Sequence, residues 1–110
     1  MKVGEIWKVD LVDTTGHEQT GTRPAIVVAV HNQAHLCVIV PMTLTMRYLN
    51  MFPNTYLIPR SRQKGLSNDS VALIFHVRAL DFRRFIEKWG DLEANFFIRI
   101  KIMLKQYLNL

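Results

Sequence analysis

Two adjacent runs of apolar residues constrain the fold of this chain more than any other feature. Residues 25–30 and 36–40 are apolar and rich in β-branched side chains, and only the polar stretch 31–35 separates them. Two such runs joined by a short polar turn predict a β-hairpin. Pro24 precedes the first predicted strand, and Pro41 is expected to end the second.

Further short segments carry strand signals on both sides of this hairpin. Residues 6–11 alternate apolar and polar side chains, residues 55–58 form a short apolar stretch, and residues 70–77 form a longer one. Polar loops separate them, at 13–23, 42–54 and 60–69. Several short strands with turn-rich connections predict a small antiparallel barrel or curled sheet.

From Glu93 onward the periodicity becomes helical. The apolar residues recur at spacings of three and four, which predicts one apolar stripe on a helix. They are Phe96, Phe97, Ile100, Met103, Leu104, Tyr107 and Leu108. Ile98 and Ile102 widen this stripe, so we expect the helix to contact a partner subunit as well as its own sheet. The prediction is a mainly β (α+β) fold in a single domain, residues 1–110.

The positive charge of the chain is concentrated in its middle. No Asp or Glu lies between Gln19 and Asn68, whereas five basic residues do, and the net charge of the chain is +5. A concentrated positive field attracts a polyanion, and nucleic acid is the common one. A basic surface that only aids solubility is the alternative.

The sequence carries no signal for secretion or membrane insertion. Cys37 is the only cysteine, so an internal disulfide is excluded. Residues 1–5 include charged side chains and come before any apolar run, which is not the pattern of a signal peptide. The apolar runs of the chain are too short to span a bilayer. His31 and His35 are four residues apart but lie in a predicted turn without a third ligand, so we expect no metal. We expect a soluble, cytoplasmic protein with no membrane contact.

The segment 15–24 carries more chemistry than a connection between strands requires. It places His17, Glu18 and Arg23 between two predicted strands, together with two glycines. A plain connector needs about two to five residues. Long polar loops held by rigid strands are typical sites of function, so this segment is the first candidate for an active site.

The same segment resembles a known family. The string GHEQTGTRPAIVVA, preceded by GEIWKVDL, is similar to the N-terminal signature of the MazF/PemK (Kid) toxins. Later strings resemble the rest of the family in the same order: VIVPMT, SNDSVALIFHVRALDFRRF and EKWGDLEANFFIRIKIMLKQYL. The resemblance implies an SH3-like antiparallel barrel with a C-terminal helix, as in MazF, PemK and CcdB. It also implies a homodimer, sequence-selective cleavage of single-stranded RNA such as mRNA, and a cognate antitoxin that blocks the site.

RNA can be cut without a metal or other cofactor, by attack of its own 2′-hydroxyl on the next phosphate. That reaction leaves a 2′,3′-cyclic phosphate and a 5′-hydroxyl, and it requires a base, an acid and a cation. Arg23 is the expected cation, because a guanidinium binds two phosphate oxygens at once. The resemblance implies that Thr43 binds the same phosphate, with Thr45 as the alternative. Glu18 and His17 are the acid and base candidates.

Other residues are predicted to bind the rest of the RNA. Arg60, Arg62 and Lys64 lie in a glycine-bearing loop inside the acid-free block, where they are expected to hold phosphates. The predicted RNA contacts also include Gln19, Thr45 and His76. Plain structural roles stay open for several of these residues, such as a salt bridge of Arg23 or a core position of His76.

Two positions depart from one branch of the family. The resemblance to Kid implies a catalytic arginine and aspartate on the later strand, but the matching residues here are Leu73 and Phe75. The arrangement of Arg23 with Thr43, as in the other branch, is therefore the better guide. The departure leaves two alternatives, a non-catalytic CcdB-like toxin that poisons gyrase and an inactive RNA-binding member of the family.

Overall fold

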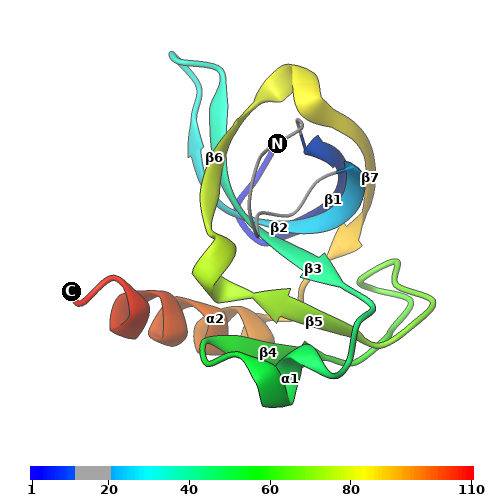
Figure 1. The fold of residues 1–110 in the computed structure, drawn as a ribbon. Helices are drawn as coiled ribbons and strands as arrows, with labels where there is room; N and C mark the ends of the chain where they lie inside the picture. The colour runs from blue at the N-terminus through cyan, green and yellow to red at the C-terminus, as the bar shows by residue number, and fades with distance from the viewer. Residues whose placement is uncertain (12–20) are drawn as a thin grey trace.

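In the computed structural model, which describes residues 1–11 and 21–110, antiparallel strands curl into a barrel with a helix packed beneath it (Figure 1). The strands are β1 (Glu5–Leu11), β2 (Gly21–His31), β3 (Leu36–Thr43), β4 (Thr55–Ile58), β5 (Ser70–Leu73), β6 (Arg78–Asp81) and β7 (Phe85–Asp91). The helices are the short α1 (Tyr48–Met51), the long α2 (Ala94–Tyr107), and two 3-10 turns at Ile74–His76 and Phe82–Arg84. The mainly β prediction with a C-terminal helix is confirmed.

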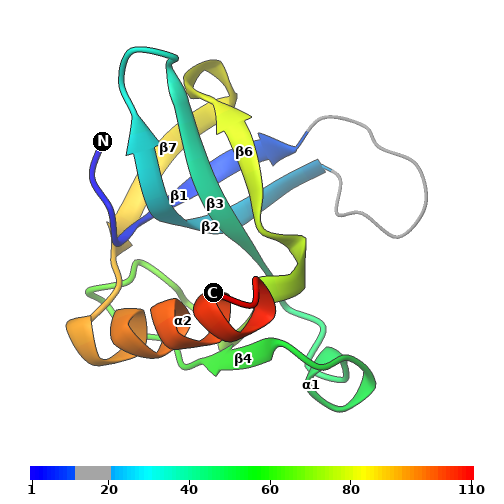
Figure 2. The same ribbon diagram turned by 90° about the vertical axis from the view of Figure 1, so that its left-hand side faces the viewer.

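The strand order is β4-β5-β3-β2-β1-β7, and every pairing is antiparallel. β3 serves two parts of this sheet. Its first half, Leu36 to Ile39, pairs with β6, and its end, Met42 and Thr43, pairs with β5. β3 thus joins the barrel to the smaller β4–β5 ribbon that lies beside α2 (Figure 2).

The predicted hairpin is confirmed as β2 and β3, but the prediction that Pro41 ends the second strand is wrong. β3 continues to Thr43, since Met42 and Thr43 pair with Ala72 and Val71 on β5. Proline removes one hydrogen-bond donor from a ladder. The pairing with β5 directly after Pro41 keeps the chain extended.

The predicted single strand over 70–77 is divided in the structure. β5 ends at Leu73, a 3-10 turn follows, and β6 begins at Arg78. The break has a topological cause, because β5 and β6 pair with successive parts of β3 and the chain must turn between them. β6 and β7 carry no long apolar run, so the sequence did not distinguish them as separate strands.

The core has two parts, on opposite faces of the central strands. One part fills the space between the sheet and α2 and includes Ile26 of β2 and Ile100 of α2. The other lies within the barrel and includes Val27 of β2 and Ile39 of β3. Successive residues of a strand point to opposite faces, so β2 contributes to both. None of the helices described by the structure has the length and apolar character to cross a membrane.

Glu5 is a buried carboxylate that joins the start of β1 to β7. It is 8% exposed, and its Oε1 accepts hydrogen bonds from the Lys2 backbone and from Trp7 Nε1, both at 2.9 Å. Lys88 Nζ lies 3.1 Å from its Oε2. Burial alone would raise the pKa of Glu5, but the bonds from Trp7, Lys2 and Lys88 outweigh it and lower the pKa from 4.5 to about 2.

This lowered pKa predicts a loss of stability in acid. The carboxylate contributes its full stabilisation above pH 4.5, and the contribution is lost as the pH falls through about 2. It corresponds to roughly 3 kcal/mol. In denaturant titrations from neutral pH to pH 2, we expect Glu5→Gln to lose less stability than the wild type, and the exposed-site variant Glu87→Gln to follow the wild type. Equal pH dependence of Glu5→Gln and the wild type would contradict this account.

Candidate functional site

Arg23 and Thr43 come from neighbouring strands at the same end of the sheet. Arg23 lies within β2, not in the preceding loop as predicted, and Thr43 is the last residue of β3. The pairing of β2 with β3 places Ala25 opposite Pro41. Arg23 lies two residues before Ala25, and Thr43 lies two residues after Pro41, so both residues lie at this end of the two strands.

The guanidinium of Arg23 has an unused donor. Its Nε atom is buried and makes no hydrogen bond with any residue of the described part of the chain. A buried N–H without a partner is uncommon in folded proteins. A guanidinium N–H is a strong, charge-assisted donor to phosphate oxygens. The position therefore suits an anionic ligand.

The hydroxyl of Thr43 is held in place by Thr45. Thr43 is 4% exposed, and its Oγ1 accepts a hydrogen bond from the Thr45 backbone at 3.3 Å and donates one to Thr45 Oγ1 at 3.3 Å. Thr45 is half-buried. The structure thus brings the two threonines that the sequence analysis considered for one role into a single bonded pair.

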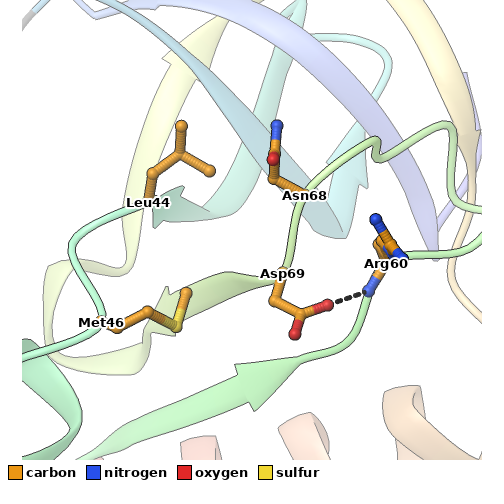
Figure 3. Close-up of a pocket in the computed structure, with 5 residues that line it drawn as sticks. All are labelled: Leu44, Met46, Arg60, Asn68 and Asp69. Atoms are coloured by element: carbon orange, nitrogen blue, oxygen red, sulfur yellow. Dashed lines mark hydrogen bonds between the residues drawn. The ribbon is translucent and has the colours of Figure 1, made fainter.

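Two hollows in the surface share the lining residues Leu44 and Asn68. The smaller has a volume of about 120 Å³ and is also lined by Pro24, Leu66, Ser67, Ser70 and Trp89. The larger has a volume of about 420 Å³ and is also lined by Met46, Arg60 and Asp69 (Figure 3). We refer to the two together as the Leu44/Asn68 cleft. Two of its lining residues, Pro24 and Leu44, directly follow Arg23 and Thr43 in the chain.

The predicted basic loop divides into exposed and buried residues. Arg60 and Arg62 are exposed, as phosphate binding would require. Arg60 lines the cleft, and its backbone N–H donates to Asp69 Oδ1 at 2.9 Å. This bond holds the two ends of the loop together.

The prediction that Lys64 binds RNA phosphates is wrong. Lys64 is 1% exposed, because the loop folds back onto the start of α2. Its Nζ lies 2.9 Å from Glu93 Oε1, 3.3 Å from Ser61 Oγ and 4.3 Å from the centre of the Phe96 ring. Burial opposes the charge of Glu93, but hydrogen bonds from Lys64, its own backbone and Ser61 outweigh it and lower its pKa. Lys64 is a structural ion-pair partner.

The loop can approach β7 this closely because residue 65 is a glycine. Gly65 has φ +69°, and a Cβ atom at this position would lie 2.0 Å from the carbonyl oxygen of Trp89. A side chain would therefore collide with backbone atoms of β7 and would also strain the left-handed conformation.

The positions that depart from the Kid branch are filled by apolar packing. Leu73 is fully buried. Phe75 lies between two aromatic rings, with ring centres 5.4 Å from Phe52 and 4.4 Å from His76. The sequence-based view that no charged pair acts here agrees with these contacts, and an RNA contact of His76 stays a prediction.

The other site predictions fall partly outside the structure. His17, Glu18 and Gln19 belong to residues 12–20, which lie outside the described part. Among residues 1–11 and 21–110, no group of three or more His, Cys, Asp or Glu side chains is arranged to hold a metal ion. The sequence analysis did not single out Leu44, Met46, Asn68 or Asp69. Their only sequence signal is that Asn68 and Asp69 mark the end of the acid-free block.

Comparison with known proteins identifies the family that this chain matches. Residues 2–108 match the family described as PemK-like, MazF-like toxin of type II toxin-antitoxin system. The chain is 28% identical over 116 residues to the endoribonuclease MazF9 of Mycobacterium tuberculosis, covering 100% of this chain and 98% of MazF9. It is 50% identical over 46 residues to the endoribonuclease PemK of Escherichia coli, covering 39% of this chain but only 35% of PemK.

A solved structure shares the fold over the whole chain. The crystal structure of MazF from Deinococcus radiodurans (Form-I) superposes with a TM-score of 0.84 at 25% identity, covering 100% of this chain and 97% of that one. The likeness therefore extends from β1 to α2.

Proposed function

The chain belongs to the PemK-like, MazF-like toxins of type II toxin–antitoxin systems, and we propose that, like its endoribonuclease relatives, it cuts single-stranded RNA without a metal. The observation that carries the proposal is the buried Nε of Arg23, which has no partner among the described residues and belongs to the strand that pairs with the strand of Thr43. In the proposed complex this N–H donates to the phosphate that is cut.

The proposed reaction is an internal transesterification. The 2′-hydroxyl oxygen bonds to phosphorus, the bond to the 5′-oxygen breaks, and a proton passes from the first oxygen to the second through the base and the acid. Arg23 stabilises the negative charge that builds on the phosphorus oxygens. Thr43 donates to one of these oxygens, which requires only that its O–H hydrogen turn away from Thr45. Glu18 and His17 remain the two proposed proton-transfer residues, and either can be the base or the acid.

The exposed cations are proposed to hold the RNA on either side of the cut. Arg60 lines the cleft and Arg62 follows it in the same loop, so each can neutralise a phosphate next to the site. Gln19, Thr45 and His76 are proposed as further RNA contacts. We also propose that the protein acts in the cytoplasm, because mRNA is translated there.

The direct test is incubation of the purified protein with a long RNA in EDTA, followed by mapping of the cut positions and their end groups. We expect cuts at a recurrent short sequence, with 2′,3′-cyclic phosphate and 5′-hydroxyl ends. Intact RNA together with inhibition of gyrase would support the CcdB-like alternative. Tight RNA binding without any products would support the inactive family member.

As a toxin of a type II system, the chain has an antitoxin as its natural partner. We propose that the cognate antitoxin neutralises it by covering the Leu44/Asn68 cleft and the neighbouring Arg23. An antitoxin bound there would exclude RNA directly.

The outer side of α2 supports a homodimer. Ile98 is 57% exposed and Ile102 is 43% exposed, although both continue the apolar arc of the helix. We expect sedimentation at micromolar concentration to give the mass of a dimer, and Ile98→Glu with Ile102→Glu to shift it toward the monomer. Gln106→Glu, an exposed change elsewhere on α2, should leave the dimer intact. A wild-type protein that sediments as a strict monomer would contradict this prediction.

A further inference from the structure

The loop between β4 and β5 packs against residues 89–93, which we call the β7–α2 junction (Figure 2). The backbone N–H of Asp91 donates to the carbonyl oxygen of Gln63 at 2.8 Å. Gly90 lies against the same part of the loop, and a Cβ atom on it would lie 2.2 Å from that carbonyl oxygen. Gly65 makes the matching close approach from the side of the loop. A glycine on each side therefore lets the two backbones lie in direct contact.

A buried ion pair fastens the loop to this junction. Lys64 Nζ lies 2.9 Å from Glu93 Oε1, and the hydroxyl of Ser61 donates to Glu93 Oε2 at 3.1 Å. The same hydroxyl accepts hydrogen bonds from the backbone N–H of Lys64 at 3.2 Å and from its Nζ at 3.3 Å. Each carboxylate oxygen of Glu93 thus contacts one residue of the loop. Because Lys64 is only 1% exposed, water screens its attraction to Glu93 very little.

The two exposed arginines of the loop lie where these contacts fix the backbone. Arg62 lies between Ser61 and Gln63, which both bond to the β7–α2 junction. The backbone N–H of Arg60 bonds to Asp69 at the other end of the loop. Neither guanidinium forms a salt bridge with any residue that the structure describes. Their backbone positions are therefore fixed, while their charged groups remain available to a ligand.

We propose that Lys64 is a positioning residue for RNA binding, which acts through Glu93 to hold the β4–β5 loop in the shape that presents Arg60 and Arg62 to RNA phosphates. The inference rests on the proposed RNA cleavage and deepens it, because it assigns the preorganisation of substrate binding to a residue that does not touch the substrate. Without the ion pair the loop adopts several shapes, and the RNA must select the one that binds. That selection weakens binding.

This role separates RNA binding from the chemical step. The residues proposed to act on the cut phosphate, Arg23 and Thr43, lie on β2 and β3, outside both the loop and the junction. Loss of the ion pair should therefore raise KM and leave kcat unchanged, which is the pattern of lost binding that is equal in the ground state and the transition state.

The first test is steady-state cleavage of one short unstructured RNA that contains a mapped cut site. Lys64→Met removes the ion pair but keeps an apolar side chain against Phe96. We expect its KM to rise about three- to tenfold, since immobilising one flexible side chain costs an amount of this size. Ser61→Ala removes the hydroxyl that bonds to both members of the pair, without removing a charge, and should raise KM by about twofold or more. Both variants should keep the kcat of the wild type.

A matched control removes another paired lysine. Lys88→Met takes away one positive charge and the ion pairs with Glu5 and Asp91, but none of the bonds of the loop. We expect this variant to keep the wild-type KM. Hydrogen exchange of the Gly65 amide, which donates to the Arg62 carbonyl at 3.0 Å, reports the shape of the loop itself. It should be faster in Lys64→Met than in the wild type and unchanged in Lys88→Met.

The salt dependence of binding distinguishes positioning from direct contact. It is measured with an RNA that carries 2′-deoxyribose before the cut and so lacks the attacking hydroxyl. Each neutralised phosphate of a single strand adds about 0.7 to the slope of log affinity against log salt. Arg62→Ala should therefore lower this slope by about 0.7. Lys64→Met should keep the wild-type slope, because Arg60 and Arg62 still reach their phosphates.

The outcomes distinguish this inference from the function on which it rests. If the wild type leaves the RNA intact, the proposed function fails and the positioning role fails with it. If the wild type cuts RNA but neither Lys64→Met nor Ser61→Ala raises KM, only the positioning role is wrong. An equal rise of KM in Lys88→Met would show a general effect of charge or stability, and a lower salt slope in Lys64→Met would show a direct phosphate contact. Either result would also overturn the proposal.

Discussion

Replacing Arg23 with alanine should slow RNA cleavage by about 10²–10³-fold or more, since single donors to a developing negative charge are worth this much in other enzymes. The fold should persist, because the Nε of Arg23 bonds to no residue of the described part of the chain. No residue in ranges 1–11 and 21–110 would lose a hydrogen bond to the Nε of Arg23 in this variant. The effect should appear in the rate measured with saturating RNA, since Arg23 is proposed to act on the transition state.

Two further variants sharpen this prediction. Arg23→Lys keeps the charge but loses the planar pair of donors, so it should restore only a small part of the rate. Arg83→Ala, which removes an exposed arginine that pairs with Asp81, should cut RNA at the wild-type rate. Thermal unfolding and circular dichroism would establish that each variant is folded. A folded Arg23→Ala protein that cuts RNA normally would refute the site assignment.

Removing the negative charge of Glu93 should destabilise the protein strongly. The substitution Glu93→Gln leaves the ammonium of Lys64 buried without its counter-charge, and that side chain is only 2% exposed. Breaking a buried ion pair from one side costs about 3–5 kcal/mol. We expect a loss of about 3 kcal/mol in the free energy of unfolding, measured by denaturant titration.

Replacing Lys64, the other partner of this ion pair, should lower the free energy of unfolding by a smaller amount. Lys64→Met leaves the carboxylate of Glu93, whose side chain is 28% exposed and can be solvated, while the methionine can pack against Phe96. The double variant Lys64→Met with Glu93→Gln should therefore be more stable than Glu93→Gln alone. The exposed-site variant Glu87→Gln controls for the loss of a surface charge. Equal stability of Glu93→Gln and Glu87→Gln would show that the pair does not hold the loop.

The sequence predicted those elements whose signal is local. The β2–β3 hairpin and α2 follow from the periodicity of neighbouring residues, and both are confirmed. The division between β5 and β6 was missed, because it depends on which half of β3 each strand pairs with. Strand pairing between distant segments leaves little trace in a single sequence.

In the candidate site too, the sequence predicted local features and missed contacts between distant segments. Arg23 and Thr43 could be named because the hairpin that carries them is local and the family resemblance is specific. Lys64 was assigned to the surface because charged residues are rarely buried without a partner, and its partner Glu93 lies far along the chain. The Leu44/Asn68 cleft was missed for a related reason. It forms where the segments after β3 and before β5 meet, together with Pro24 of β2 and Trp89 of β7, so its residues carry no common motif.

The pairing of β3 on both of its edges affects the order in which parts of this protein unfold. β3 pairs with β2 along most of its length, and with β6 and then β5 on its other edge. Strands bonded on both edges belong to the last unit to unfold, whereas edges and loops open first. Thr43 is the final residue of that strand and pairs with Val71 of β5, so we expect the hydroxyl proposed to bind phosphate to stay in place when the loops around it open. We therefore expect the loops proposed to contact RNA to change shape, for a substrate or for an antitoxin, while the residues proposed to cut keep their arrangement.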